Sequence, residues 1–167
     1  MLVVSDSSPL NFLIRLRVEG VLPALFGRVL IPPVVQEELT RPSTPQIVRD
    51  FIANPPSWLE ILAPSTIEPI PKIDRGEEAA ISLAREVKAD ALLIDERAGR
   101  QAAAQRGLAT IGLLGILDRA DEKKLIDFAT LSSALPPDYR IDPALVETIL
   151  ERSRQRRSNP ANRAGQT

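Results

Sequence analysis

The chain contains no histidine and no cysteine among its 167 residues. Without histidine, a Ser-His-Asp triad, imidazole acid-base chemistry, a two-His-one-carboxylate iron site and nearly all catalytic zinc sites are excluded. Without cysteine, disulfides, zinc-thiolate sites and thiol nucleophiles are excluded, and a reducing compartment is compatible. Any catalysis must therefore use carboxylates, Lys, Arg, Ser or Tyr.

Aromatic residues and long apolar runs are also scarce. Aromatics make up 4% of the chain and are scattered, so they do not predict a base-stacking platform. The apolar run at residues 2–4 is too short for a signal peptide or a membrane span. We therefore expect a cytoplasmic protein with no membrane contact.

Charge is unevenly placed along the chain. The net charge is −1, but residues 151–167 hold five Arg and one Glu, or +4, which leaves −5 on residues 1–150. A basic end of this kind, rich in Asn, Pro, Gly and Gln, is more typical of a solvated, disordered segment than of a nucleic-acid arm. The sequence predicts one folded domain over residues 1–150 and a disordered basic tail over residues 151–167.

Short apolar strands and amphipathic helices alternate. Strands are predicted at residues 2–4, 28–31, 59–62, 91–94 and 108–111. Residues 22–26 are predicted to be a short helix or turn, and residues 63–74 a Pro-rich, linker-like loop. Helices are predicted at residues 8–18, 34–39, 45–53, 76–87, 97–106, 113–120 and 142–157. This alternation indicates βαβ units, hence a parallel sheet with helices on both faces.

Carboxylates stand at the ends of these elements. Asp6 and Asp95 each follow an apolar strand, and the carboxyl ends of parallel strands share the edge at which ligands bind. An acidic pair, Glu77 and Glu78, opens one helix, and a second pair, Glu37 and Glu38, lies on the helix after the second strand. The pattern leaves the choice within each pair open. Each acid taken singly could also be a helix cap or a surface residue.

Taken together, the acids favour a metal site. Four clustered carboxylates would repel one another and raise one another's pKa values unless a cation lay among them. Carboxylate and water ligands suit Mg²⁺ or Mn²⁺, and such sites typically serve phosphate chemistry.

The segments that carry these acids resemble the PIN-domain family, and more narrowly its VapC-like, toxin-related subgroup of bacteria, archaea and cyanobacteria. The matching segments are residues 4–10, 31–39, 76–84 and 92–100, followed by Gly107-Leu108 and residues 112–117, within about residues 2–126. The resemblance implies a three-layer α/β/α sandwich with about four or five parallel strands. It also implies Mg²⁺- or Mn²⁺-dependent cleavage of single-stranded RNA, frequent homodimers and a small antitoxin that blocks the site.

Carried over to this sequence, the resemblance assigns roles to single residues. It implies that four acids bind the metal and are catalytic: Asp6, Glu38, Glu77 and Asp95. It also implies that Glu96 is an outer ligand and that the hydroxyl of Ser8 supports the metal site. Arg97 and Arg100 are candidates for holding RNA phosphates, although a solvated helix face explains them as well. The alternative function is a catalytically weak or inactive PIN-like module that binds RNA or a partner protein.

Overall fold

The computed structural model describes residues 1–139 and 142–158. The chain forms two compact units, the first spanning Met1–Leu113 and the second beginning at Leu114. Within the described ranges, no helix combines the length and the apolar character needed to cross a membrane.

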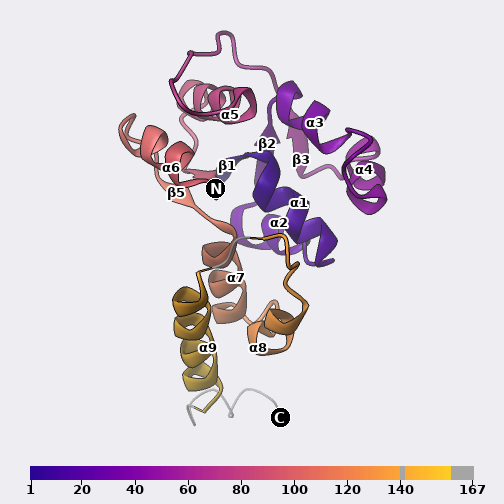
Figure 1. The fold of residues 1–167 in the computed structure, drawn as a ribbon, viewed down its shortest axis with the longest axis vertical. Helices are drawn as coiled ribbons and strands as arrows, with labels where there is room; N and C mark the ends of the chain where they lie inside the picture. Colours follow the sequence, from indigo (N-terminus) through magenta and orange to yellow (C-terminus); the bar gives the residue numbers. More distant parts are fainter. Residues whose placement is uncertain (140–141, 159–167) are drawn as a thin grey trace. The chain divides into compact units, whose positions relative to one another are not determined.

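The first unit is built on a parallel sheet (Figure 1). Its described strands, in the order β3-β2-β1-β4-β5, are β1 (Leu2–Ser5), β2 (Arg28–Ile31), β3 (Leu59–Ile61), β4 (Ala91–Leu93) and β5 (Thr110–Ile111). Val4 of the central strand lies opposite Leu30 on one side and Leu92 on the other. The predicted parallel sheet is confirmed, and each strand lies within one or two residues of its predicted place.

Helices cover both faces of this sheet. They are α1 (Ser7–Arg15), α2 (Val21–Phe26), α3 (Pro33–Leu39), α4 (Gln46–Ala53), α5 (Arg75–Glu86) and α6 (Arg97–Ala104). Val4, Leu30 and Leu92 point to one face, where they pack in a common core with residues of α5 and α6. Alternate strand residues point to the other face, where α2 contacts β2 and α1 lies beside it (Figure 1). The fold of this unit is therefore the expected three-layer α/β/α arrangement.

The Pro-rich segment before α5 is pinned along that helix. We call residues 65–70 the strap. Its backbone N–H groups at Ser65, Glu68 and Ile70 donate to side chains of α5, and the acceptors are Glu86 at 2.7 Å, Ser82 at 3.0 Å and Glu78 at 2.7 Å. These helix positions are four residues apart and so share one face. This part of the segment predicted as a linker-like loop is therefore held against the helix.

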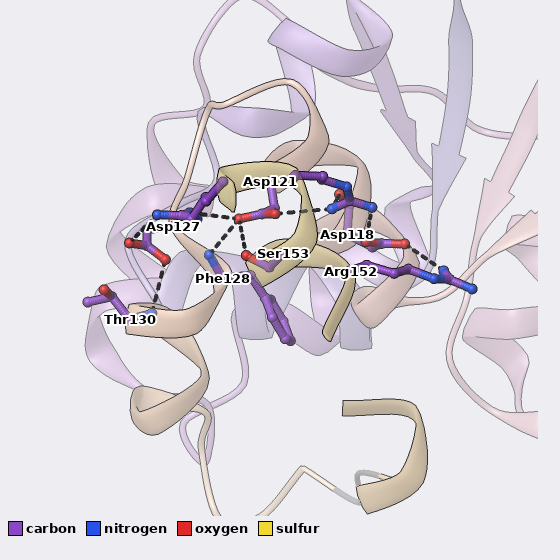
Figure 2. Close-up of polar contacts among 9 residues, drawn as sticks. Asp118, Asp121, Asp127, Phe128, Thr130, Arg152 and Ser153 are labelled. Carbon is purple, nitrogen blue, oxygen red and sulfur yellow. Dashed lines mark hydrogen bonds and ion pairs between the residues drawn. The ribbon is translucent and has the colours of Figure 1, made fainter. Parts of the chain in front are cut away.

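The second unit contains α7 (Leu113–Glu122), α8 (Phe128–Leu131), a 3₁₀ turn η1 (Ser132–Ala134) and α9 (Pro143–Ser158). Its centre is Asp121, whose side chain is only 2% exposed. Figure 2 shows this carboxylate accepting hydrogen bonds from the backbone of Phe128 at 3.0 Å and from the Ser153 hydroxyl at 3.1 Å. The carboxylate thereby connects α7 with both α8 and α9.

Arginines of α9 complete this network (Figure 2). Arg156 binds Asp121 at 3.0 Å and Asp118 at 2.7 Å, while Arg157 binds Asp121 at 3.0 Å and Asp127 at 2.6 Å. These ion pairs offset the positive charge that the sequence gathers at the end of α9.

The expected boundary at residue 150 differs from the structure. Helix α9 matches the helix predicted at residues 142–157 and runs through Ser158, so residues 151–158 are helical, although the sequence also predicts them to be part of the disordered tail. The reason is that aspartates of α7 and of the turn before α8 pair with the arginines that made this segment look solvated. The rest of the predicted tail, residues 159–167, lies outside the described residues.

Candidate active site

Two predicted acids follow neighbouring strands at the centre of the sheet. Strand β1 lies between β2 and β4, and the chain changes direction across the sheet at this place. Asp6 follows β1, and its backbone N–H donates to the Leu93 carbonyl at 2.9 Å; Asp95 follows β4 two residues later. Open α/β sheets bind ligands outside the carboxyl ends of their strands at such a reversal point.

Asp6 is a buried carboxylate, 3% exposed. It occupies the N-cap position of α1, yet in the described chain its side chain makes no capping hydrogen bond, so capping does not account for it. Burial raises the pKa of Asp6 from 3.8 to about 7; the Ser7 backbone N–H lowers it in part, and the charges of Glu77, Asp74 and Glu38 raise it further. A buried acid surrounded by other acids is a strong candidate for cation binding.

Glu38 contributes from α3. It is half-buried, whereas Glu37 is exposed, and this difference in burial favours Glu38 as the candidate of the pair. Its carboxylate is hydrogen-bonded by the Ser7 side chain, and burial raises its pKa. Gly76 gives it room, because a Cβ there would lie 2.6 Å from Oε1 and 2.8 Å from Oε2 of Glu38.

Glu77 contributes from the first turn of α5 and is 3% exposed. Its Oε2 accepts the Asp74 backbone N–H at 3.3 Å, while its Oε1 is buried and has no hydrogen-bond partner among the described residues. Burial raises the pKa of Glu77 to about 7, and the charges of Asp74, Glu96 and Glu38 add to this. The neighbouring Glu78 instead accepts the Ile70 backbone N–H of the strap at 2.7 Å, which favours Glu77 as the candidate of this pair.

Asp74 is an acid that our reading of the sequence missed. It is the N-cap of α5, where its Oδ1 accepts the Glu77 backbone N–H at 2.8 Å, so the two residues form a reciprocal capping box. Its charge raises the pKa of Asp6, Glu38 and Glu77 alike. The Asp-x-x-Glu spacing was readable in the sequence, but it lies at the end of a Pro-rich stretch that we took as a linker.

Asp95 has a different environment. Its Oδ1 accepts the Leu113 backbone N–H at 2.8 Å, at the first residue of α7. A Cβ at Gly112 would lie 2.9 Å from this oxygen. Part of this carboxylate is therefore already committed to a helix terminus.

The remaining predicted residues lie around these acids. Glu96 is exposed at the start of α6, and its charge acts on Glu77. Arg97 and Arg100 are exposed on α6. The hydroxyl expected at Ser8 has a counterpart one residue earlier, where Ser7 contacts Glu38.

These acids fit a divalent cation by their chemistry. Carboxylate oxygens are the ligands that Mg²⁺ and Mn²⁺ prefer, and the buried Oε1 of Glu77 has no hydrogen-bond partner among the described residues. As they stand, however, no three Asp or Glu side chains of residues 1–139 and 142–158 are close enough together to hold an ion. Cation binding here therefore requires at least one carboxylate to rotate toward the others.

A carboxylate cluster at the reversal point of a parallel sheet defines an α/β protein that binds its ligand beyond the strand ends. Residues 2–155 match the DUF3368 family model, described as a PIN domain, and the chain belongs to the PIN-domain family. PIN domains are generally metal-dependent nucleases.

Comparison with solved structures supports the same fold. A PilT N-terminus domain protein from the hyperthermophilic archaeon Sulfolobus solfataricus P2 superposes with a TM-score of 0.53. It is 15% identical, and the match covers 85% of this chain and 100% of that chain. No curated protein matches the sequence.

Proposed function

We propose that this protein is an Mg²⁺- or Mn²⁺-dependent endoribonuclease that cleaves single-stranded RNA. The observation that carries the proposal is the buried Oε1 of Glu77, which no described residue hydrogen-bonds, on a carboxylate that interacts electrostatically with Asp6, Glu38 and Asp74. Membership of a generally nucleolytic family supports it. The similarity to VapC-like sequences adds to the proposal a toxin role, an antitoxin that covers the site, and a homodimer.

Within this proposal, Asp6, Glu38 and Glu77 hold the cation, with Asp95 and Glu96 completing the set. When bound, a divalent ion at such a site lowers the pKa of water and stabilises charge on the leaving oxygen. Ser7 fixes the Glu38 carboxylate through its hydrogen bond. Arg97 and Arg100 on α6 hold phosphates of the RNA backbone and so align the scissile bond, while Ser8 remains a candidate support for the site.

A second candidate function is a PIN-like module without catalysis that binds RNA or a partner protein. The observation that favours it is the Asp95 contact, because one of the four expected acids already accepts the Leu113 N–H at 2.8 Å. Because this oxygen of Asp95 is already hydrogen-bonded, such a site would bind the ion weakly or in a different geometry.

Cleavage of a labelled, unstructured RNA oligonucleotide in Mn²⁺ tests the proposal. We expect cleavage by the wild type, its loss in Asp6→Asn, and no change in Glu78→Gln, which keeps the acceptor that Ile70 uses. Cleavage by Asp6→Asn at the wild-type rate contradicts the proposed site.

A thermal-unfolding arm separates the two candidates. Binding at ~100 times the dissociation constant stabilises the fold by about 2.7 kcal/mol, which raises the melting temperature. Stabilisation by Mn²⁺ without RNA cleavage favours the non-catalytic module, and cleavage together with stabilisation favours the nuclease.

A further inference from the structure

Asp74 stands at the junction of two structural features. It follows the strap, which the Glu78, Ser82 face of α5 holds in place, and it begins α5 as its N-cap. Two residues later, Gly76 lies against the Glu38 carboxylate, and three residues later comes the buried Glu77. Asp74 is therefore held to the start of α5 by the capping box, and its charge acts on two acids of the proposed site, Glu38 and Glu77.

The capping box engages only one of the two carboxylate oxygens of Glu77 in a hydrogen bond. The Asp74 backbone N–H donates to Oε2 of Glu77 at 3.3 Å. The other oxygen, Oε1, is buried and has no hydrogen-bond partner among the described residues. The backbone of Asp74 thus orients the carboxylate that carries the proposed function.

The side chain of Asp74 differs from its neighbours in exposure. Asp74 is exposed, whereas Asp6 and Glu77 are each 3% exposed. Of these three acids, Asp74 is the one whose carboxylate a divalent ion can approach from solvent while the ion keeps its hydration water.

A cap alone does not require a full charge at this place. Asn and Ser cap helices about as well as Asp does. An aspartate whose negative charge acts on three other carboxylates costs stability in the absence of a cation. The charge of Asp74 is therefore expected to have a use that capping does not supply.

We propose that Asp74 is a further acid of the cation site. It acts as a positioning residue, because its backbone orients Glu77, and its exposed carboxylate adds negative charge for a hydrated divalent ion. This inference rests on the proposed function and deepens it.

The test uses two substitutions of Asp74 in the full chain, with Mn²⁺ as the probe and titration calorimetry as the readout. Asp74→Asn keeps the cap and removes the charge, whereas Asp74→Glu keeps the charge and weakens the cap. Glu78→Gln is the matched control, since it removes one charge from the same helical turn but keeps the strap contact.

We expect Asp74→Asn to weaken Mn²⁺ binding on the order of tenfold, about 1.4 kcal/mol, with Asp74→Glu closer to the wild type. Without metal, Asp74→Asn is expected to melt at the same temperature as the wild type or higher, because it removes repulsion and keeps the cap. A residue that only caps the helix would leave the Mn²⁺ affinity unchanged.

Three outcomes overturn the inference. Wild-type affinity in Asp74→Asn refutes it, and so does an equal loss in Glu78→Gln, because the effect would then be general electrostatics. Failure of the wild type itself to bind Mn²⁺ refutes the proposed function and, with it, the role of Asp74, and this failure is visible before any variant is compared.

Discussion

Gly99 of α6 and Glu77 of α5 lie so close together that a Cβ at position 99 would overlap Oε1 of Glu77. The same Cβ would lie 2.9 Å from Cδ of Glu77. The absence of a side chain on one helix therefore provides the space for a buried carboxylate on the next.

Gly99→Ala is expected to displace Glu77. Although alanine is the better helix former, the overlap in a packed interior costs more, and we expect a net loss of about 1–3 kcal/mol in stability. Mn²⁺ affinity is expected to fall as well, because the oxygen that moves is the one without a partner. Urea unfolding and Mn²⁺ titration measure the two effects.

Gly20→Ala is the control for this experiment. Gly20 has φ −61°, and a Cβ there meets no described atom within 4 Å. We expect a change within about 0.5 kcal/mol and unchanged Mn²⁺ affinity. Equal effects of the two substitutions would show that the Gly99 contact with Glu77 has no special importance.

The metal-free protein is expected to lose stability as the pH rises from about 4 to about 7. The pKa values of Asp6 and Glu77 are raised to about 7 by burial, from 3.8 and 4.5, so the folded state binds more protons than the unfolded state in this window. Stability then falls with increasing pH, by several kcal/mol. Thermal unfolding across this range in a chelating buffer measures it.

Two comparisons test the assignment of that pH dependence. Asp6→Asn is expected to flatten the curve, and saturating Mn²⁺ is expected to reverse it, because the ion favours ionised carboxylates. Unchanged pH dependence in Asp6→Asn would contradict the assignment to this acid.

Asp121 is expected to make stability depend on pH in the opposite direction, so that its contribution is lost when the pH falls. Burial alone would raise the pKa of Asp121, but hydrogen bonds from Phe128, Arg157, Ser153 and Arg156 together lower it. Its contribution to stability is therefore present above about pH 4, the unfolded value, and is lost as the pH falls through the lowered folded value.

Asp121→Asn is expected to cost about 1–3 kcal/mol near neutral pH, because it removes the charged acceptor shared by α8 and α9. Glu147→Gln, which removes an exposed pair with Arg154, is the control and is expected to cost less than about 0.5 kcal/mol. Urea unfolding followed by circular dichroism measures both. Similar values for the two variants would contradict a central role for Asp121.

The strap predicts a difference between two substitutions of one residue. Glu78→Ala leaves the Ile70 backbone N–H without its acceptor and is expected to cost about 1–2 kcal/mol, whereas Glu78→Gln keeps an acceptor and is expected to cost little. Hydrogen exchange at the Ile70 amide is expected to speed up only in Glu78→Ala. Slow exchange in both variants would show that Glu78 does not hold the strap.

Much of the fold is readable in the sequence because local signals agree with it. Apolar, β-branched runs end at Asp6 and Asp95, and prolines and glycines mark most element ends. The short helix α8 was missed, because four residues show no helical period and depend on the Asp127 cap, whose side chain accepts the Thr130 N–H at 3.2 Å.

The membership of the candidate site is less readable, because it depends on contacts between distant segments. Glu38 is favoured over Glu37 by its burial and its contact with Ser7, and Glu77 is favoured over Glu78 because Glu78 accepts a hydrogen bond from the strap. A local sequence pattern does not reveal such contacts, because the residues in contact lie in different segments of the sequence. Asp95 illustrates the same limit, since its bond to Leu113 spans eighteen residues.

The ion pairs of α9 have a consequence for how this protein would respond to salt. Arg152, Arg156 and Arg157 form ion pairs with aspartates of their own unit. Their positive charges are therefore already neutralised by carboxylates of the protein. A nucleic acid gains affinity from release of condensed ions only where a cation is available to its phosphates. If RNA binds as proposed, the slope of its affinity against salt concentration is expected to fall when Arg97 or Arg100 is replaced, and to change little when an arginine of α9 is replaced.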